Sequence, residues 1–215
     1  MDICLLTRRN ADLIERFIAK DPKYPNNMSP IIQGLGIYQS GAPISKICKI
    51  MDNSNLNRFV WQVAVSNSIQ GKTHTTKQLI TDYILSCGAN FYERLEKGDL
   101  ELVQDMVSYI VSRGGRHECS WCSKICKYLN EYLFNNDKYF IYDGNVKKRL
   151  NVYRVYYRLP KISRKNIEHC DANWYVNFFN SLEELRNQLK EKLTRSEIDH
   201  IMWGFHKYPV PLTRI

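Results

Sequence analysis

Apolar residues recur at spacings of three and four along most of the chain, and this helical period constrains the fold more than any other feature of the sequence. The period runs through residues 56–63, 79–87, 102–111, 121–132, 146–157, 182–193 and 198–205. Alternation of apolar and polar residues, which is typical of a half-buried strand, is hard to find, and only Lys138–Tyr142 is expected to be extended. The sequence therefore predicts an all-α protein of roughly eight to ten helices.

Proline and glycine interrupt the helical pattern near the beginning of the chain. They predict a loop over Asp21–Gly41, which separates a short helix at about Asn10 to Lys20 from the rest of the chain. A chain of 215 residues is one domain of ordinary size, or one domain with a small lobe. We expect residues 1–97 to hold the N-terminal helices and this loop, within the same fold or as a lobe, and residues 98–215 to hold the functional region.

The composition favours a polyanionic partner. The net charge is +9 and the pI about 9.2, and nucleic acid is the commonest partner of such proteins, although a basic protein without an anionic partner is the alternative. No apolar run approaches the roughly 20 residues that span a bilayer, so no membrane partner is expected. The seven cysteines and the absence of a signal-peptide pattern at Met1–Leu5 predict a reducing compartment, the bacterial cytoplasm (nucleoid) or a nucleus. The sequence leaves the oligomeric state open, with a monomer favoured.

The positive charge is concentrated between Gly144 and Cys170. This stretch holds eight basic residues and one acid, Glu168. Its first part, 145–158, predicts a helix with one apolar face and one polar, cationic face. The cationic face is expected to contact DNA phosphates without reading sequence, and a solvated charged surface is the alternative. The candidate DNA-binding residues of this helix are Lys147, Lys148, Arg154 and Arg158.

Lys124 and Asp143 are the candidate catalytic residues. Lys124 is expected near the start of an amphipathic helix that Ser120 or Ser123 caps, and a partly buried amine at a helix N-terminus favours the neutral, nucleophilic form. Asp143 follows 19 residues later and is expected to cap the basic helix. An amine and a carboxylate suffice to form a Schiff base at a sugar carbon. The alternative is a surface lysine and a structural helix cap.

Three segments of the chain are similar to bacterial 8-oxoguanine DNA glycosylase-like proteins of the helix-hairpin-helix DNA glycosylase superfamily. They are Ser120-Trp121-Cys122-Ser123-Lys124 with the aromatic-rich helix expected after it, Phe140-Ile141-Tyr142-Asp143, and the closing stretch Arg195–Lys207. The resemblance covers roughly residues 98–207 and implies an all-α helix-hairpin-helix glycosylase fold. The sequence departs from the family at one point. The family has a Gly-x-Gly turn just before the lysine, whereas the glycines nearest before Lys124 are Gly114 and Gly115.

The resemblance also implies a reaction and a partner. Lys124 would be the Schiff-base nucleophile and Asp143 would activate it, so that a modified or oxidised base is excised from double-stranded DNA, with or without strand cleavage at the abasic site, and without a cofactor. The target nucleotide must first flip out of the duplex. Further candidate DNA contacts are Arg113, Arg116, Ser120, Ser123 and Lys127. Trp121, Phe140 and Trp203 are candidates for stacking on the flipped base, although core packing is favoured for each.

The sequence leaves two other functions open. A DNA-binding protein that kept the fold and lost the reaction, for example in a mobile element or in phage defence, would explain the missing glycine turn. A zinc-stabilised regulator would use the cluster His117, Cys119, Cys122 and Cys126, whose residue types are zinc ligands. Since no second Cys-x2-Cys pair follows, no metal is expected.

Overall fold

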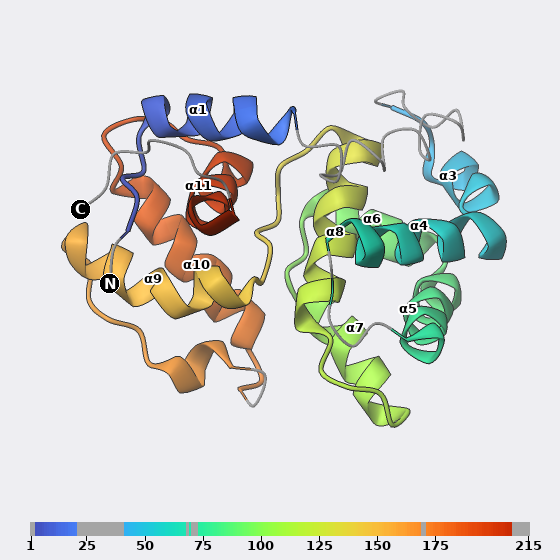
Figure 1. Cartoon of the computed structure of the whole chain (residues 1–215). Helices are drawn as coiled ribbons and strands as arrows, with labels where there is room; N and C mark the ends of the chain where they lie inside the picture. The colour runs from blue at the N-terminus through green and yellow to red at the C-terminus, as the bar shows by residue number, and fades with distance from the viewer. Residues whose placement is uncertain (1–2, 21–40, 68, 70–72, 169–170, 208–215) are drawn as a thin grey trace. The chain divides into compact units, whose positions relative to one another are not determined.

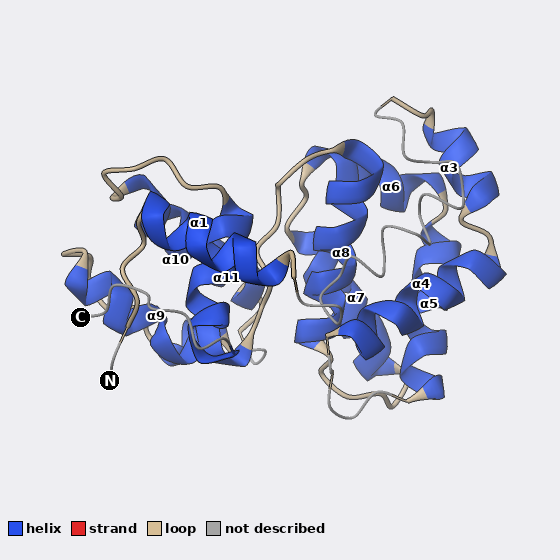
Figure 2. Ribbon diagram, turned by 45° about the horizontal axis from the view of Figure 1, so that its top comes forward, coloured by secondary structure: helices blue, strands red, loops and turns tan. Residues whose placement is uncertain are grey.

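Helices make up most of the described part of the protein. The computed structural model describes residues 3–20, 41–67, 69, 73–168 and 171–207 (Figure 1). Within these ranges it forms ten α-helices and one short 3-10 helix, and no strand is drawn (Figure 2). The predicted all-α class with eight to ten helices is confirmed. Most of the expected proline- and glycine-rich loop, residues 21–40, lies outside the described residues.

The chain forms two compact units. The first unit combines Met1–Asp21 with Phe140–Ile215, and the second is Pro22–Tyr139. The division expected between residues 97 and 98 falls inside the second unit. No helix in the described part of the chain combines the length and the apolar character needed to cross a membrane.

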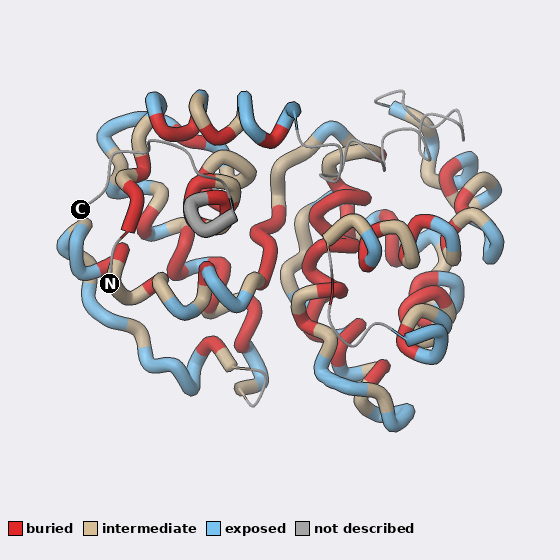
Figure 3. The backbone as a smooth tube through the Cα atoms, in the orientation of Figure 1, coloured by how far each residue is buried: buried red, intermediate tan, exposed pale blue. Residues whose placement is uncertain are grey.

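The second unit is built around one buried helix, α8. Its helices are α3 (Ile44–Ile50), α4 (Asn53–Ser66), α5 (His74–Cys87), α6 (Ala89–Lys97), α7 (Glu101–Ser112) and α8 (Cys119–Phe134). Helix α8 packs against α4, α6 and α7, and it is buried along most of its length (Figure 3). Trp121 on α8 is fully buried, and its indole N–H donates to the Val60 carbonyl of α4 at 3.0 Å. Apolar burial against three helices therefore positions α8.

The turn between α7 and α8 requires both of its glycines. Gly114 has φ of +78°, a left-handed conformation that L-residues with a Cβ rarely adopt. At Gly115 an added Cβ would collide with the side chain and carbonyl oxygen of Ile110. Arg113 and Arg116 flank this pair and are exposed, so the turn between α7 and α8 is tight and basic.

The first unit joins the two ends of the sequence. Its helices are α1 (Arg8–Ile18), α9 (Gly144–Tyr156), η2 (Arg164–Ile167), α10 (Trp174–Asn187) and α11 (Arg195–Lys207). Helix α1 packs along α11, with an ion pair between Arg8 and Glu197. The segment before α1 is held by α9, because the Cys4 N–H donates to the Tyr153 hydroxyl at 3.2 Å.

Glu183 links α10 to α11 in the first unit. Its carboxylate accepts hydrogen bonds from Arg186 of its own helix and from Arg195 at the start of α11, at 2.8–3.0 Å. Burial opposes the charged form of Glu183, but the two guanidinium groups outweigh it and hold the pKa of this carboxyl below its usual range. The junction is therefore formed with an ionised glutamate.

Residues 138–142, where the chain passes from one unit to the other, form neither helix nor strand. Their backbone groups bond to side chains instead of a neighbouring strand. The Lys138 N–H donates to Asn130 at 3.1 Å within the second unit. In the first unit, the Ile141 N–H donates to Asp199 at 2.9 Å, and the Phe140 carbonyl accepts from the Tyr175 hydroxyl at 2.6 Å. The expected extended segment forms no strand pair, because these side chains take up the hydrogen bonds of its backbone.

Helix α9 ends in a left-handed residue that is not glycine. The Arg158 N–H donates to the Val155 carbonyl at 3.0 Å, and the Leu159 N–H donates to the Arg154 carbonyl at 2.7 Å. This is the Schellman arrangement, in which glycine usually occupies the left-handed position. Here Arg158 occupies it with φ of +60°, at a cost of about 1–2 kcal/mol for an L-residue.

We predict that Arg158→Gly stabilises the protein. Removing the Cβ relieves about 1–2 kcal/mol of strain, while the greater freedom of glycine in the unfolded chain costs about 0.5–1 kcal/mol, so the net gain is about 0.5–1 kcal/mol. Chemical denaturation measures it, with Arg158→Ala as the control that removes the guanidinium and keeps the strain. A loss of stability in Arg158→Gly would contradict the strain assigned to this position.

Candidate catalytic and nucleic-acid-binding residues

Lys124 lies in the second turn of α8, deeper in the helix than expected. The helix begins at Cys119, and its N-cap is Glu118, whose side chain makes no capping hydrogen bond. The expectation that Ser120 or Ser123 caps this helix is wrong, because both lie inside it and the Ser123 hydroxyl donates to the Ser120 carbonyl at 3.1 Å. Burial raises the pKa of the Glu118 carboxyl, although Arg116 acts in the opposite direction.

The amine of Lys124 is buried and held in place by its own helix. The residue is only 7% exposed, and its Nζ donates to the Ser120 hydroxyl, one turn earlier, at 2.7 Å. Lysine is seldom buried unless its ammonium group has a partner. Lys127, three residues later and also buried, forms an ion pair with Asp137. Helix α8 therefore carries two buried lysines, and Lys127 is an internal ion-pair partner rather than an exposed DNA contact.

Asp143 caps α9, as the sequence predicted. Its Oδ1 accepts a hydrogen bond from the Asn145 N–H at 2.7 Å, and its backbone has the extended conformation of an N-cap. Asp143 belongs to the first unit and Lys124 to the second. Their pairing at one reaction centre stays a prediction.

The cationic face expected on α9 is divided between internal and exposed residues. Arg154 is buried, and its guanidinium donates to the carbonyls of Pro160 and Ser181 and pairs with Glu184. The expectation that Arg154 faces outward is wrong, because the chain after α9 folds back over it.

The other three candidate DNA contacts of this stretch remain near the surface. Lys147 pairs with Glu168 at 2.8 Å, and its Nζ lies 5.2 Å from the centre of the Tyr142 ring. Lys148 and Arg158 are exposed. The predicted DNA contacts of α9 are therefore reduced to one paired lysine and two exposed cations.

Two of the three aromatic residues suggested for base stacking are core residues. Trp121 and Phe140 are fully buried. Trp121 contacts α4, and the ring of Phe140 lies edge-on to that of Phe179, with 5.3 Å between the ring centres. Both therefore pack in the core, which is the alternative that the sequence favoured over base stacking. Trp203 on α11 is half-buried, and its role as a stacking residue stays a prediction.

The cysteines of α8 are buried thiols. Cys119, Cys122 and Cys126 are all buried, and none of the three is part of a disulfide. Burial raises the pKa of both Cys122 and Cys126, which disfavours the thiolate that a metal would bind. Among the described residues, no three His, Cys, Asp or Glu side chains are placed to hold a metal ion.

Three exposed basic residues lie outside the candidate set. Lys161, Arg164 and Lys165, between α9 and α10, are exposed like Lys148 and Arg158, and none of these five forms an ion pair with a described residue. Two acids of this region pair with other basic residues, Glu168 with Lys147 and Glu184 with Arg154. The near-absence of acids over 144–170 was the sequence signal for these three additional residues, which we group with Lys148 and Arg158 as the basic strip.

The comparisons with known proteins concern the second unit. The family model HI_0787_N, described as an N-terminal domain, matches residues 38–136. That range lies inside the second unit and includes Lys124 but not Asp143. No curated protein and no solved structure matches the chain.

We predict that Arg154→Ala destabilises the protein by about 2–4 kcal/mol, because it leaves buried carbonyl groups without a donor and creates a cavity. The matched control, Lys148→Ala on the exposed side of the same helix, is expected to change stability by less than about 0.5 kcal/mol. Urea denaturation of both variants provides the comparison. Unchanged stability together with weaker DNA binding in Arg154→Ala would instead make this arginine a DNA contact.

Proposed function

We propose that the chain is a DNA glycosylase that removes a modified or oxidised purine, with Lys124 as nucleophile and Asp143 as the assisting carboxylate. The observation that carries the proposal is the buried Lys124, held at its Nζ by Ser120. An amine that the fold takes out of water and orients is suited to attack on carbon.

In the proposed reaction, the neutral amine of Lys124 forms a bond to C1′ of a flipped-out nucleotide. The C1′–N bond to the base breaks, and the base leaves with the electron pair and takes up a proton. Opening of the sugar ring and loss of the second amine proton then give an imine between Nζ and C1′. Loss of a C2′ proton expels the 3′ phosphate, and hydrolysis of the imine releases the enzyme.

Asp143 is suited to the assisting role because its carboxylate is held by the backbone of α9. The Asn145 N–H donates to its Oδ1 at 2.7 Å and fixes the carboxylate at the start of the helix. A fixed negative charge stabilises the positive charge that develops at C1′ while the base leaves. Since Asp143→Asn keeps an N-cap side chain, this variant tests the charge without removing the helix cap.

The turn between α7 and α8 supports a duplex as the substrate. The exposed Arg113 and Arg116 flank two glycines that keep the turn tight. Arginine side chains bind phosphate oxygens well, so this turn is assigned the phosphate-binding role that a Gly-x-Gly turn has in the family the chain resembles.

The test is reductive trapping with sodium borohydride on duplexes carrying 8-oxoguanine, uracil or an abasic site. We expect wild type to form a covalent adduct with at least one duplex and Lys124→Gln to form none. Asp143→Asn is expected to lower the rate of base excision by about 100-fold or more, the scale on which one stabilising charge acts.

Lys127→Arg is the matched control, because it removes the second buried amine of α8 and keeps a positive charge opposite Asp137. Its adduct is expected to persist. The thermal unfolding of each variant is measured in parallel, so that a folded Lys124→Gln without an adduct identifies the nucleophile. An adduct that survives in Lys124→Gln would reassign it, and no adduct or base release in wild type on any duplex would remove the glycosylase proposal.

A DNA-binding protein without a reaction is the second candidate, and the basic strip is the observation that favours it. Five exposed cations that form no ion pair with a described residue are suited to phosphate contacts on any sequence. This candidate needs no reactive lysine and no flipped base.

For this candidate we predict salt-dependent binding to undamaged duplex DNA. Each phosphate contact contributes about −0.9 to the slope of log K against log salt, so Arg164→Gln combined with Lys165→Gln should flatten the slope by about two. Lys20→Gln, at an exposed lysine just after α1 and outside the basic strip, is the control, with an unchanged slope expected. A slope that does not respond to the double variant would remove the strip from the interface.

A further inference from the structure

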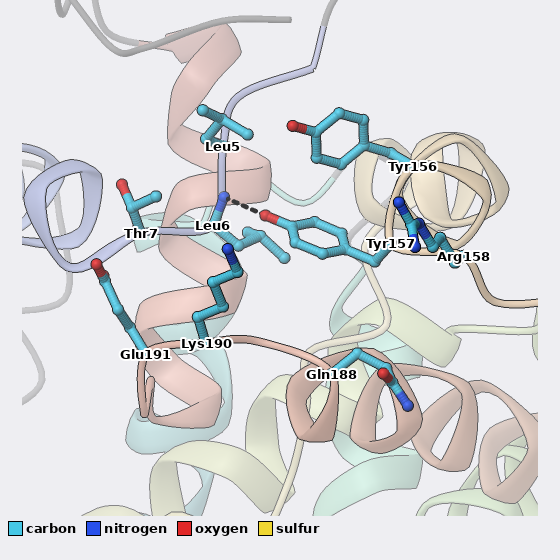
Figure 4. A pocket seen from close by; sticks show the side chains of 9 residues that line it. All are labelled: Leu5, Leu6, Thr7, Tyr156, Tyr157, Arg158, Gln188, Lys190 and Glu191. Atoms are coloured by element: carbon cyan, nitrogen blue, oxygen red, sulfur yellow. Dashed lines mark hydrogen bonds between the residues drawn. The ribbon is translucent and has the colours of Figure 1, made fainter.

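The first unit holds an open cleft at the C-terminal end of α9. Its volume is about 620 Å³, within the range of small-molecule sites (Figure 4). Three segments line it: residues 5–7 before α1, residues 156–158 at the end of α9, and residues 188–191 after α10. All belong to the first unit, so the cleft is distinct from Lys124.

The charge of this cleft favours an anion. Arg158 and Lys190 are exposed and form no ion pair with a described residue. The one acid of the lining, Glu191, accepts the backbone N–H of Arg8 through its carboxylate. The lining therefore carries two cations against one carboxylate, and that carboxylate is bonded to the backbone before α1.

The cleft also offers an aromatic ring. Tyr156 is 46% exposed, which is high for a large apolar side chain, and lies edge-on to Tyr157 with 5.0 Å between ring centres. Tyr157 is fixed in turn, because its hydroxyl accepts the Leu6 N–H at 3.0 Å (Figure 4). An exposed ring on a rigid support is a suitable stacking platform for a nucleobase.

Arg158 is the third feature that points to a ligand. It occupies the left-handed position at the end of α9, where glycine would be more stable. Strained residues cluster at functional sites, where the side chain is needed despite the strain. At this cleft the residue that carries the strain is also one of the two available cations.

We infer that this cleft binds an unpaired nucleotide of a DNA strand, with the base stacked on Tyr156 and the adjoining phosphate between Arg158 and Lys190. Three residues after Arg158, the loop that follows α9 carries another exposed cation, Lys161 of the basic strip. The inference goes beyond the glycosylase reaction, because it assigns a second nucleic-acid site that contains neither Lys124 nor Asp143.

The test measures binding of the full chain to a fluorescent oligothymidylate and to a chain of abasic deoxyribose phosphates of the same length. We expect wild type to bind the oligothymidylate at least about fivefold more tightly, since stacking on an aromatic ring contributes that much or more. Tyr156→Ala should remove this preference and leave binding to the abasic chain unchanged. Val155→Ala, at an exposed neighbour outside the lining, is the matched control and should retain the preference.

Charge is tested separately with Arg158→Gly, Arg158→Gln and Lys190→Gln. Each should weaken binding to both chains and flatten the salt dependence by about 0.7, the value for one single-strand phosphate contact. Because Arg158→Gly is expected to be more stable than wild type, weaker binding in this variant cannot come from unfolding.

Equal binding of the two chains by wild type, or an unchanged preference in Tyr156→Ala, would overturn the inference. The assay needs no lesion and no Schiff base. If the oligothymidylate preference is absent but borohydride trapping succeeds, only the nucleotide-binding proposal for the cleft is rejected. If trapping fails but the preference is present, only the glycosylase proposal is rejected.

Discussion

The second unit depends on placing polar side chains inside an otherwise apolar contact. Helix α8 is buried, yet it carries Lys124, Lys127 and Asn130 at buried positions. A buried polar group without a partner costs several kcal/mol, so each partner restricts how the helix can rotate or slide. Lys127 fixes the helix to Asp137, and Asn130 donates to the Leu95 carbonyl of α6 at 2.8 Å. The position of Lys124 follows from these neighbours.

The same side chains direct the segment that leaves α8. Asn130 also accepts the Lys138 N–H, and the next residues are anchored in the first unit through Tyr175 and Asp199. This series of side-chain contacts replaces a sheet or a helix as the means of fixing the backbone. The last of these contacts is at Ile141, two residues before Asp143 caps α9, so the orientation of that carboxylate depends on contacts made over the preceding five residues.

Helical periodicity predicted the elements that bury a clear apolar stripe, and helix-cap chemistry predicted the role of Asp143. The short helices α3 and α6 were not singled out, because each offers few turns in which a period can be seen. The burial of Arg154 could not be predicted, because the helical period places it on the same face as exposed cations. It is covered only when the chain brings Pro160 and Ser181 back over α9. For the same reason, the cleft beside Tyr156 was invisible in the sequence: its walls come from three distant segments that only the folded unit brings together.

The composition of the first unit from both ends of the sequence sets an order for folding. Glu15 on α1 contacts His200 on α11, 185 residues away, whereas every contact within the second unit joins residues of one continuous stretch. During synthesis, α1 emerges early and has to wait for α11 before its apolar face is covered. The second unit can collapse in that interval, and folding it brings the two halves of the first closer together. Loop closure by the second unit thus lowers the entropic barrier to completing the first.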